Sequence, residues 1–155
     1  MADNDGFAGS RVHVGSFLFE VDGLEIGSFQ QVSGLQVQIA VEDIEEGGEN
    51  GFTHHLPGRM SWPNITLKRG VTQTDNLLDW LNKSSGEQFA SAGNKLTRSS
   101  AALTLMGPGA TRLRSWEFVD AFAVKWTGPD FASTAAEMAS EQLEIAHHGF
   151  KSKTP

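Results

Sequence analysis

The chain of 155 residues contains no cysteine and no tyrosine, and it has no long apolar run. The lack of cysteine excludes disulfides, thiolate nucleophiles and cysteine-ligated zinc. No segment approaches the ~18 consecutive apolar residues that indicate a membrane span. Residues 1–6 are polar and acidic, whereas a signal peptide begins with basic residues followed by apolar ones. We therefore expect no membrane span, and a chain that is made and assembles in the cytoplasm.

Positive charge is also scarce. The chain has 12 Lys and Arg residues against 19 Asp and Glu residues, which gives a net charge of −7. Proteins that wrap a nucleic-acid backbone normally carry a surplus of basic residues, so this composition disfavours sequence-independent nucleic-acid binding. The length fits one domain, and we expect residues 1–155 to form a single domain that begins with a flexible arm over residues 1–13.

Short alternating apolar segments predict a mainly β fold. The 17 glycines, ten phenylalanines and four tryptophans favour strands joined by tight turns. Apolar residues recur at every second position of 17–21, and the turn signal Asp22-Gly23 follows. One short helix is expected from the N-cap residue Thr74 to about Lys83. These patterns predict an antiparallel β-sandwich or barrel with one short flanking α-helix.

A second hairpin is predicted over residues 103–126, with its turn at residues 107–109. Asp120 interrupts the apolar face of its second strand, either at a bulge or beside a partner. The apolar face is otherwise expected to carry Trp116, Phe118, Phe122, Val124 and Trp126.

The longest strand pattern lies between residues 29 and 68. From 35 to 42, apolar and polar side chains alternate, which is typical of a strand buried on one side only. The apolar positions are Leu35, Val37, Ile39 and Val41, and the polar positions are Gln36, Gln38, Ala40 and Glu42. An extended run over 29–46 would reach about 60 Å, well beyond an ordinary strand. A second extended stretch over 52–68 completes a long hairpin, and exposed edges on such strands would be removed by closure into a ring.

Two histidine pairs, His54-His55 and His147-His148, are the first candidates for metal or acid–base chemistry. Adjacent strand residues point to opposite faces, so each pair offers one ligand per face and the spacing supplies no third ligand. We interpret them as surface or interface residues, the acidic run 42–46 as a solvated or intersubunit strand end, and the four tryptophans as core residues. No catalytic, cofactor-binding or metal-binding residue is predicted.

Five segments resemble the tail tube (inner tube) proteins of contractile-tailed phages and contractile injection systems. Residues 29–35, FQQVSGL, are similar to the family's x-x-V-S-G-L segment, and residues 46–50, EGGEN, to its E-G-G-x-N hairpin tip. Residues 56–59 and 64–70 resemble its L-P-G and N-I-T-L-K-R-G segments, and residues 143–150 its L-E-I-A-H-x-G ending. The matches keep the family order over residues 17–150.

The resemblance implies a structural protein whose subunits form stacked homohexameric rings. The long hairpins would together build a ring-shaped β-barrel around a channel for a cargo protein or DNA. A contractile sheath and a baseplate with a spike would be partners, and the protein would be part of a phage virion tail or an injection particle. It implies no enzyme activity and no cofactor.

Within that framework, two groups of residues are expected to act in assembly and transport. The hairpin tip is too polar and glycine-rich to be core, so we expect it to contact the next ring; it consists of Glu46, Gly47, Gly48, Glu49, Asn50 and Gly51. The polar positions of the preceding strand carry no positive charge that would hold a polyanion, so we expect them to face the lumen. These are Gln36, Gln38, Ala40 and Glu42.

Two other functions remain open from the sequence. One is a monomeric β-sandwich that binds a carbohydrate or another ligand on Trp62 or Trp116. The other is a small histidine-dependent hydrolase. Whether the tube would belong to a phage, a secretion system or an extracellular injection particle is also open.

Overall fold

The computed structural model describes residues 15–48, 50–73, 75–85, 91, 93, 98–130 and 139–154. The arm expected over residues 1–13, the N-cap Thr74 and the tip residue Glu49 lie outside these residues. The described elements are β1 (Ser16–Val21), β2 (Leu24–Phe29), β3 (Gln31–Ser33), β4 (Gln38–Ile44), β5 (His54–Ser61), β6 (Ile65–Gly70), α1 (Asn76–Ser85), β7 (Ser99–Met106), η1 (Pro108–Ala110), β8 (Arg112–Thr127), β9 (Ser140–Ala146) and β10 (Phe150–Lys153).

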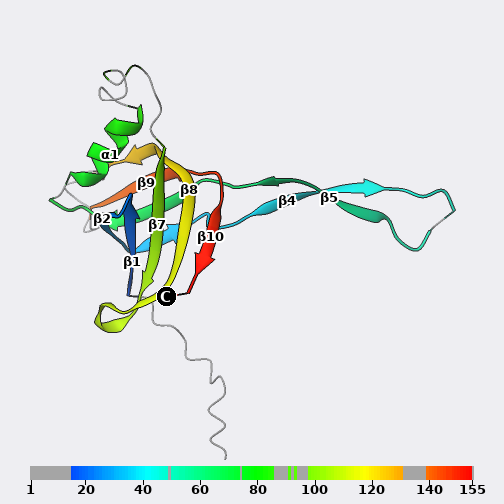
Figure 1. Ribbon diagram of the computed structural model, residues 1–155, viewed down its shortest axis with the longest axis horizontal. Helices are drawn as coiled ribbons and strands as arrows, with labels where there is room; N and C mark the ends of the chain where they lie inside the picture. Colours follow the sequence, from blue (N-terminus) through cyan, green and yellow to red (C-terminus); the bar gives the residue numbers. More distant parts are fainter. Residues whose placement is uncertain are drawn as a thin grey trace, which may run out of the picture.

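The prediction of a mainly β, antiparallel fold with one flanking helix is confirmed. Eight strands form one sheet in the order β2-β1-β7-β8-β9-β6-β3, with β10 paired to β8 as well. The sheet curls into a half-closed body, and α1 lies across one end of it (Figure 1). The strands β4 and β5 form a separate two-stranded sheet that leaves this body.

The long strand β8 joins the two halves of the body. Its first part pairs with β7 and β10, and its second part pairs with β9. Between these parts the register shifts opposite Ser99 and Ala101, and Asp120 adopts a φ of 52°. The interruption predicted at Asp120 is therefore a β-bulge, whose extra residue turns the side chains directly after it, up to Ala123, to the opposite face of the strand.

This reversal makes one prediction wrong. Phe118 before the bulge is buried as expected, but beyond the bulge the buried side chains are Ala121 and Ala123. Val124, expected on the apolar face, is 46% exposed. The residue inserted at the bulge moves the side chains of 121–123 to the other face. A second register shift, between Ala123 and Lys125, brings Trp126 back against the core as predicted.

One apolar core fills the body between the curled sheet and α1. The helix contributes Leu77 and Trp80, and the Trp80 ring lies 5.6 Å from the Phe19 ring. Trp116 and Trp126 are partly buried and pack against the same core. The largest fully buried side chains are Phe19, Phe29, Ile65, Leu67, Leu77, Leu103, Leu143 and Ile145.

A buried ion pair lies at the edge of this core. Arg69 of β6 donates from Nε to Glu141 Oε1 of β9 at 2.5 Å, and Glu141 Oε2 accepts from the Trp126 indole at 3.1 Å. The Arg69 guanidinium also lies over the Phe29 ring, 5.1 Å from its centroid. Both charges are thus paired and hydrogen-bonded, as buried charges must be. The sequence does not predict this pair, because a lone Arg in a strand gives no signal of burial.

Candidate assembly surfaces

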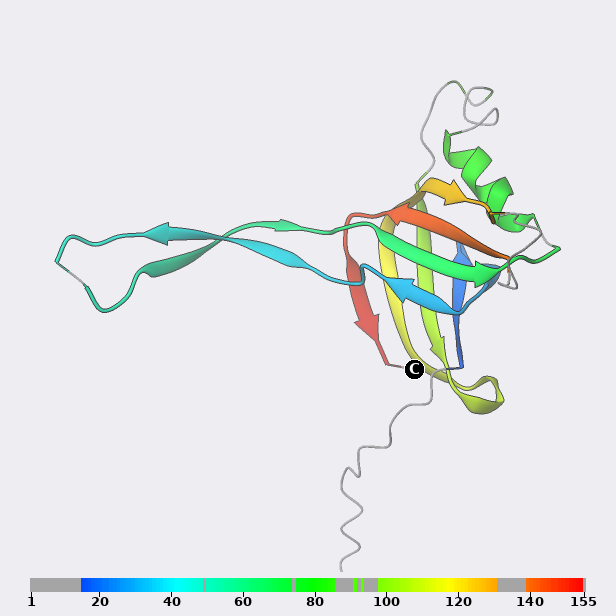
Figure 2. The same cartoon turned by 180° about the vertical axis from the view of Figure 1, so that it is seen from behind.

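The β4–β5 hairpin projects far from the body in both views (Figures 1 and 2). Its strands pair antiparallel from Gln38 opposite Ser61 to Ile44 opposite His54, with a register shift between Ile39 and Val41. The long hairpin expected from the sequence is confirmed, but its first strand is not continuous. β3 ends at Ser33 and β4 begins at Gln38, so the hairpin consists of a root on the body and a free outer ribbon.

The outer ribbon is exposed on both faces, which contradicts the prediction of a strand buried on one side. Every residue of β4 is exposed. On one face Ile39 is 50% exposed, Val41 is 61% exposed and the cross-strand Met60 is 51% exposed. The alternation correctly marks an apolar face, but nothing within the described chain covers that face. An uncovered apolar surface of this kind marks a site of association.

The residues expected to face a lumen are all exposed, and three of them share one face of β4. Gln38, Ala40 and Glu42 alternate along that face. Gln36 precedes the strand, and its backbone N–H donates to the Gly34 carbonyl at 2.9 Å. Toward the tip the same face becomes apolar, because Glu42 lies opposite Leu56, which is 45% exposed.

Near the tip, two groups singled out separately in the sequence come together. His54 Nε2 lies 3.4 Å from Glu46 Oε2, and His55 Nδ1 lies 2.6 Å from Asp43 Oδ1. Each histidine thus pairs with a carboxylate of the acidic run, on opposite faces of the ribbon. The His54 side chain is 42% exposed, and the other three side chains are more exposed than that. The described tip residues, which are Glu46, Gly47, Gly48, Asn50 and Gly51, are exposed as well.

The root of the hairpin is fixed to the body by close packing. Gly34 has a φ of 82°, and a Cβ there would overlap the Asn64 carbonyl oxygen, so only glycine fits. Asn64 Nδ2 donates to Glu144 Oε1 at 2.8 Å. The Trp62 ring packs edge-on against the Phe150 ring at 5.1 Å. We call Trp62, Pro63, Asn64, His147 and Phe150 the root cluster.

His147 is the polar centre of the root cluster. It is 5% exposed, so the prediction that it is a surface or interface residue is wrong. Its Nδ1 accepts from the Gly149 N–H at 3.1 Å, which leaves the ring proton on Nε2 to be donated to the Pro63 carbonyl at 3.1 Å. Burial lowers the pKa of His147, outweighing these two hydrogen bonds, which act in the opposite direction. The ring is therefore neutral, and it joins the hairpin to the corner between β9 and β10.

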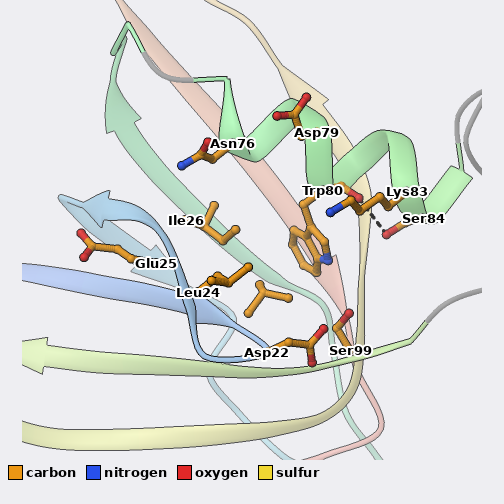
Figure 3. A pocket seen from close by; sticks show the side chains of 11 residues that line it. Asp22, Leu24, Glu25, Ile26, Asn76, Asp79, Trp80, Lys83, Ser84 and Ser99 are labelled. Carbon is orange, nitrogen blue, oxygen red and sulfur yellow. Dashed lines mark hydrogen bonds between the residues drawn. The ribbon is translucent and has the colours of Figure 1, made fainter.

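A cleft of about 460 Å³ separates α1 from the β1–β2 turn. Leu24, Ile26 and Trp80 point into it, whereas the carboxylates of Glu25 and Asp79 point away (Figure 3). Leu24 is 69% exposed. The cleft therefore has an apolar floor, and it lies at the edge of the sheet where β2 is the last strand.

The described residues contain no group of three or more His, Cys, Asp or Glu side chains arranged to hold a metal ion. Across the same residues, no helix has the length and apolarity needed to cross a membrane. The described chain thus combines a body whose apolar core is buried with a projecting ribbon whose apolar side chains are exposed. These features define a β protein with a surface suited to association.

Comparison with known proteins identifies the family. Residues 15–151 match the family described as T4-like virus tail tube protein gp19. The chain belongs to this tail tube family, as the resemblance in its sequence predicted. No curated protein matches it by sequence.

Solved structures share the fold. The tube–sheath complex of the extracellular contractile injection system PVC, in its extended state, contains a chain that is 23% identical; the match covers 96% of this chain and 95% of that one, with a TM-score of 0.77. A chain of the anti-feeding prophage cap is also 23% identical over 100% of both chains, with a TM-score of 0.74. Hcp1 from Flavobacterium johnsoniae is 14% identical, covering 91% of this chain and 97% of that one, with a TM-score of 0.51.

Proposed function

We propose that the protein is the inner-tube subunit of a contractile tail or contractile injection system. It self-associates into stacked hexameric rings around a channel for cargo protein or DNA, inside a contractile sheath and above a baseplate. It acts as a structural protein and not as an enzyme. The observation that carries this proposal is the outer ribbon, whose apolar face has no cover in the single chain. Membership of the tail tube family and the shared fold support it.

Two surfaces have assigned roles in this proposal. The tip, Glu46 to Gly51, contacts the neighbouring ring, since it lies at the far end of a ribbon that projects well beyond the body. The polar positions Gln36, Gln38, Ala40 and Glu42 face the channel, where side chains without positive charge do not retain a polyanion. The apolar face with Ile39 and Val41 would then lie against a neighbouring subunit.

The ligand-binding alternative has less support. The Trp62 ring is packed against Phe150, and the Arg114 guanidinium lies over the Trp116 ring, 5.6 Å from its centroid. Protein groups thus already occupy the rings that a sugar would stack on. A hydrolase would need a histidine poised beside a nucleophile, whereas His147 makes hydrogen bonds only to backbone groups.

The test uses one substitution on the ribbon and a matched one on the body. Val41→Asp places a charge on the uncovered apolar face, and Val124→Asp places one on an exposed part of β8. Both variants should fold, because neither valine is buried. When the protein is co-expressed with its sheath and baseplate proteins, only Val41→Asp should abolish tubes in negative-stain micrographs. Normal tubes from Val41→Asp would show that the ribbon does not drive assembly.

A further inference from the structure

One half of the body is a run of strands with a free edge at each end. In the order β2, β1, β7, β8 and β10, each strand pairs antiparallel with the next. Among the described residues β2 pairs with β1 alone, and β10 pairs with β8 alone. Figures 1 and 2 place these two end strands on opposite sides of the body. Exposed strand edges are templates for pairing with another chain.

One row of directly opposed residues crosses all these strands. Directly opposed residues of a sheet point to the same face, so the members of the row are neighbours on one surface. From β2 to β10 the row consists of Glu25, Glu20, Ala102, Glu117 and Lys151. The row therefore begins with a negative charge at one free edge and ends with a positive charge at the other.

The inner charges of this row have ion-pair partners among the described residues, and the outer charges have none there. Arg112 Nη1 lies 3.4 Å from Glu20 Oε2, and Lys153 Nζ lies 3.3 Å from Glu117 Oε1. Glu25 lies directly opposite Glu20, an unfavourable pairing of like charges. Neither Glu25 nor Lys151 forms an ion pair with another described residue, and both are exposed.

We propose that, in the ring, the β10 edge of one copy lies against the β2 edge of the next copy, with Lys151 of the first facing Glu25 of the second. This inference rests on the proposed function, and it identifies the seam between subunits. Each edge is expected to pair with a second copy of this chain, because the two edge strands carry opposite charges on the same face of the sheet. A head-to-tail contact between two different edges produces a closed ring when the rotation from one copy to the next adds up to a full turn.

Reversing the charges of Lys151 and Glu25 tests the proposed contact between neighbouring subunits. Lys151→Glu and Glu25→Lys should each raise the protein concentration needed for half-maximal tube formation by about tenfold or more, because like charges then meet across the contact. The double variant Lys151→Glu with Glu25→Lys should restore assembly, and Lys125→Glu on β8 serves as the matched control. Single variants that assemble normally, or a double variant that stays defective, would overturn the seam while wild-type tubes still support the proposed function. A wild-type chain that never forms tubes would reject both.

Cross-linking provides a second test, since the chain has no cysteine of its own. A variant with Glu25→Cys and Lys151→Cys, assembled into tubes and oxidised, should give a ladder of covalent multimers on a denaturing gel without reductant. The pair Glu25→Cys and Lys125→Cys should stay monomeric on the same gel. Intact tubes that yield only monomer from the first pair would show that these edges do not meet.

Discussion

His147 illustrates how a single polar side chain can fix the position of a whole element. Its two ring nitrogens bind backbone groups of Pro63 and Gly149, and its ring packs against Phe118 at 5.0 Å. This arrangement requires a neutral imidazole, because a protonated Nδ1 could not accept from the Gly149 N–H. Protonation would therefore cost one buried hydrogen bond and place a charge in the root cluster.

We expect the stability of the chain to depend on pH through His147. The pKa of His147 is lowered in the folded chain below the ordinary value of 6.5, so the unfolded chain binds the proton more tightly. The contribution of the neutral ring is complete above pH 6.5, and the free energy of unfolding falls as the pH drops through 6.5 toward the folded pKa. Urea titrations between pH 8 and pH 5 at constant ionic strength measure this slope.

The variant His147→Gln should lower stability by about 1–2 kcal/mol at pH 8 through the lost acceptor, and it should lose most of the slope. The exposed neighbour provides the control, because His148→Gln leaves the buried ring in place. An unchanged slope in His147→Gln would assign the pH dependence to other groups.

The Arg69–Glu141 pair should be strongly coupled. Arg69→Met leaves Glu141 as a buried charge without its partner, and we expect a loss of about 3–5 kcal/mol in the free energy of unfolding. The double variant Arg69→Met with Glu141→Met should recover most of this loss, since no charge then remains buried. Urea unfolding of the wild type, both single variants and the double variant gives the coupling energy. Strictly additive losses would mean that the two residues act independently.

At the scale of elements, the sequence predicted where strands and turns lie better than what covers them. The turn at Asp22-Gly23, the helix and the hairpin were found because turn residues and apolar periodicity are local signals. The facing of β8 beyond Asp120 was missed, since a bulge inserts one residue without a strong signal in the sequence. The exposure of the ribbon was missed because alternation marks an apolar face without identifying its partner.

The hairpin tip should be dispensable for folding and required for elongation. Deleting residues 48–50 removes no apolar side chain, so the melting temperature of the isolated chain should change little. If the tip contacts the next ring, tubes of this variant should be absent or much shorter in electron micrographs. A variant with Gly47→Ser, which keeps the loop length, is the matched control. Tubes of normal length from the deletion would show that the tip is only a turn.

At the scale of the assembly, the proposed channel wall can be mapped by labelling. Gln38→Cys introduces the only thiol of the chain on the polar face of β4. In assembled tubes a small thiol reagent should reach it while a bulky one is excluded, since the channel limits access by size. In the unassembled chain both reagents should react, because residue 38 is exposed. Equal reactivity toward both reagents in intact tubes would place Gln38 on an outer surface.

The central claim is that this chain builds the inner tube. Electron cryomicroscopy of particles formed by co-expression with its sheath and baseplate proteins tests it most directly. The account predicts a tube of stacked sixfold rings inside the sheath, with the β4–β5 ribbon of each subunit covered by neighbouring subunits. A chain that stays monomeric beside its assembled partners, or a tube in which the apolar face of the ribbon remains open to solvent, would contradict it.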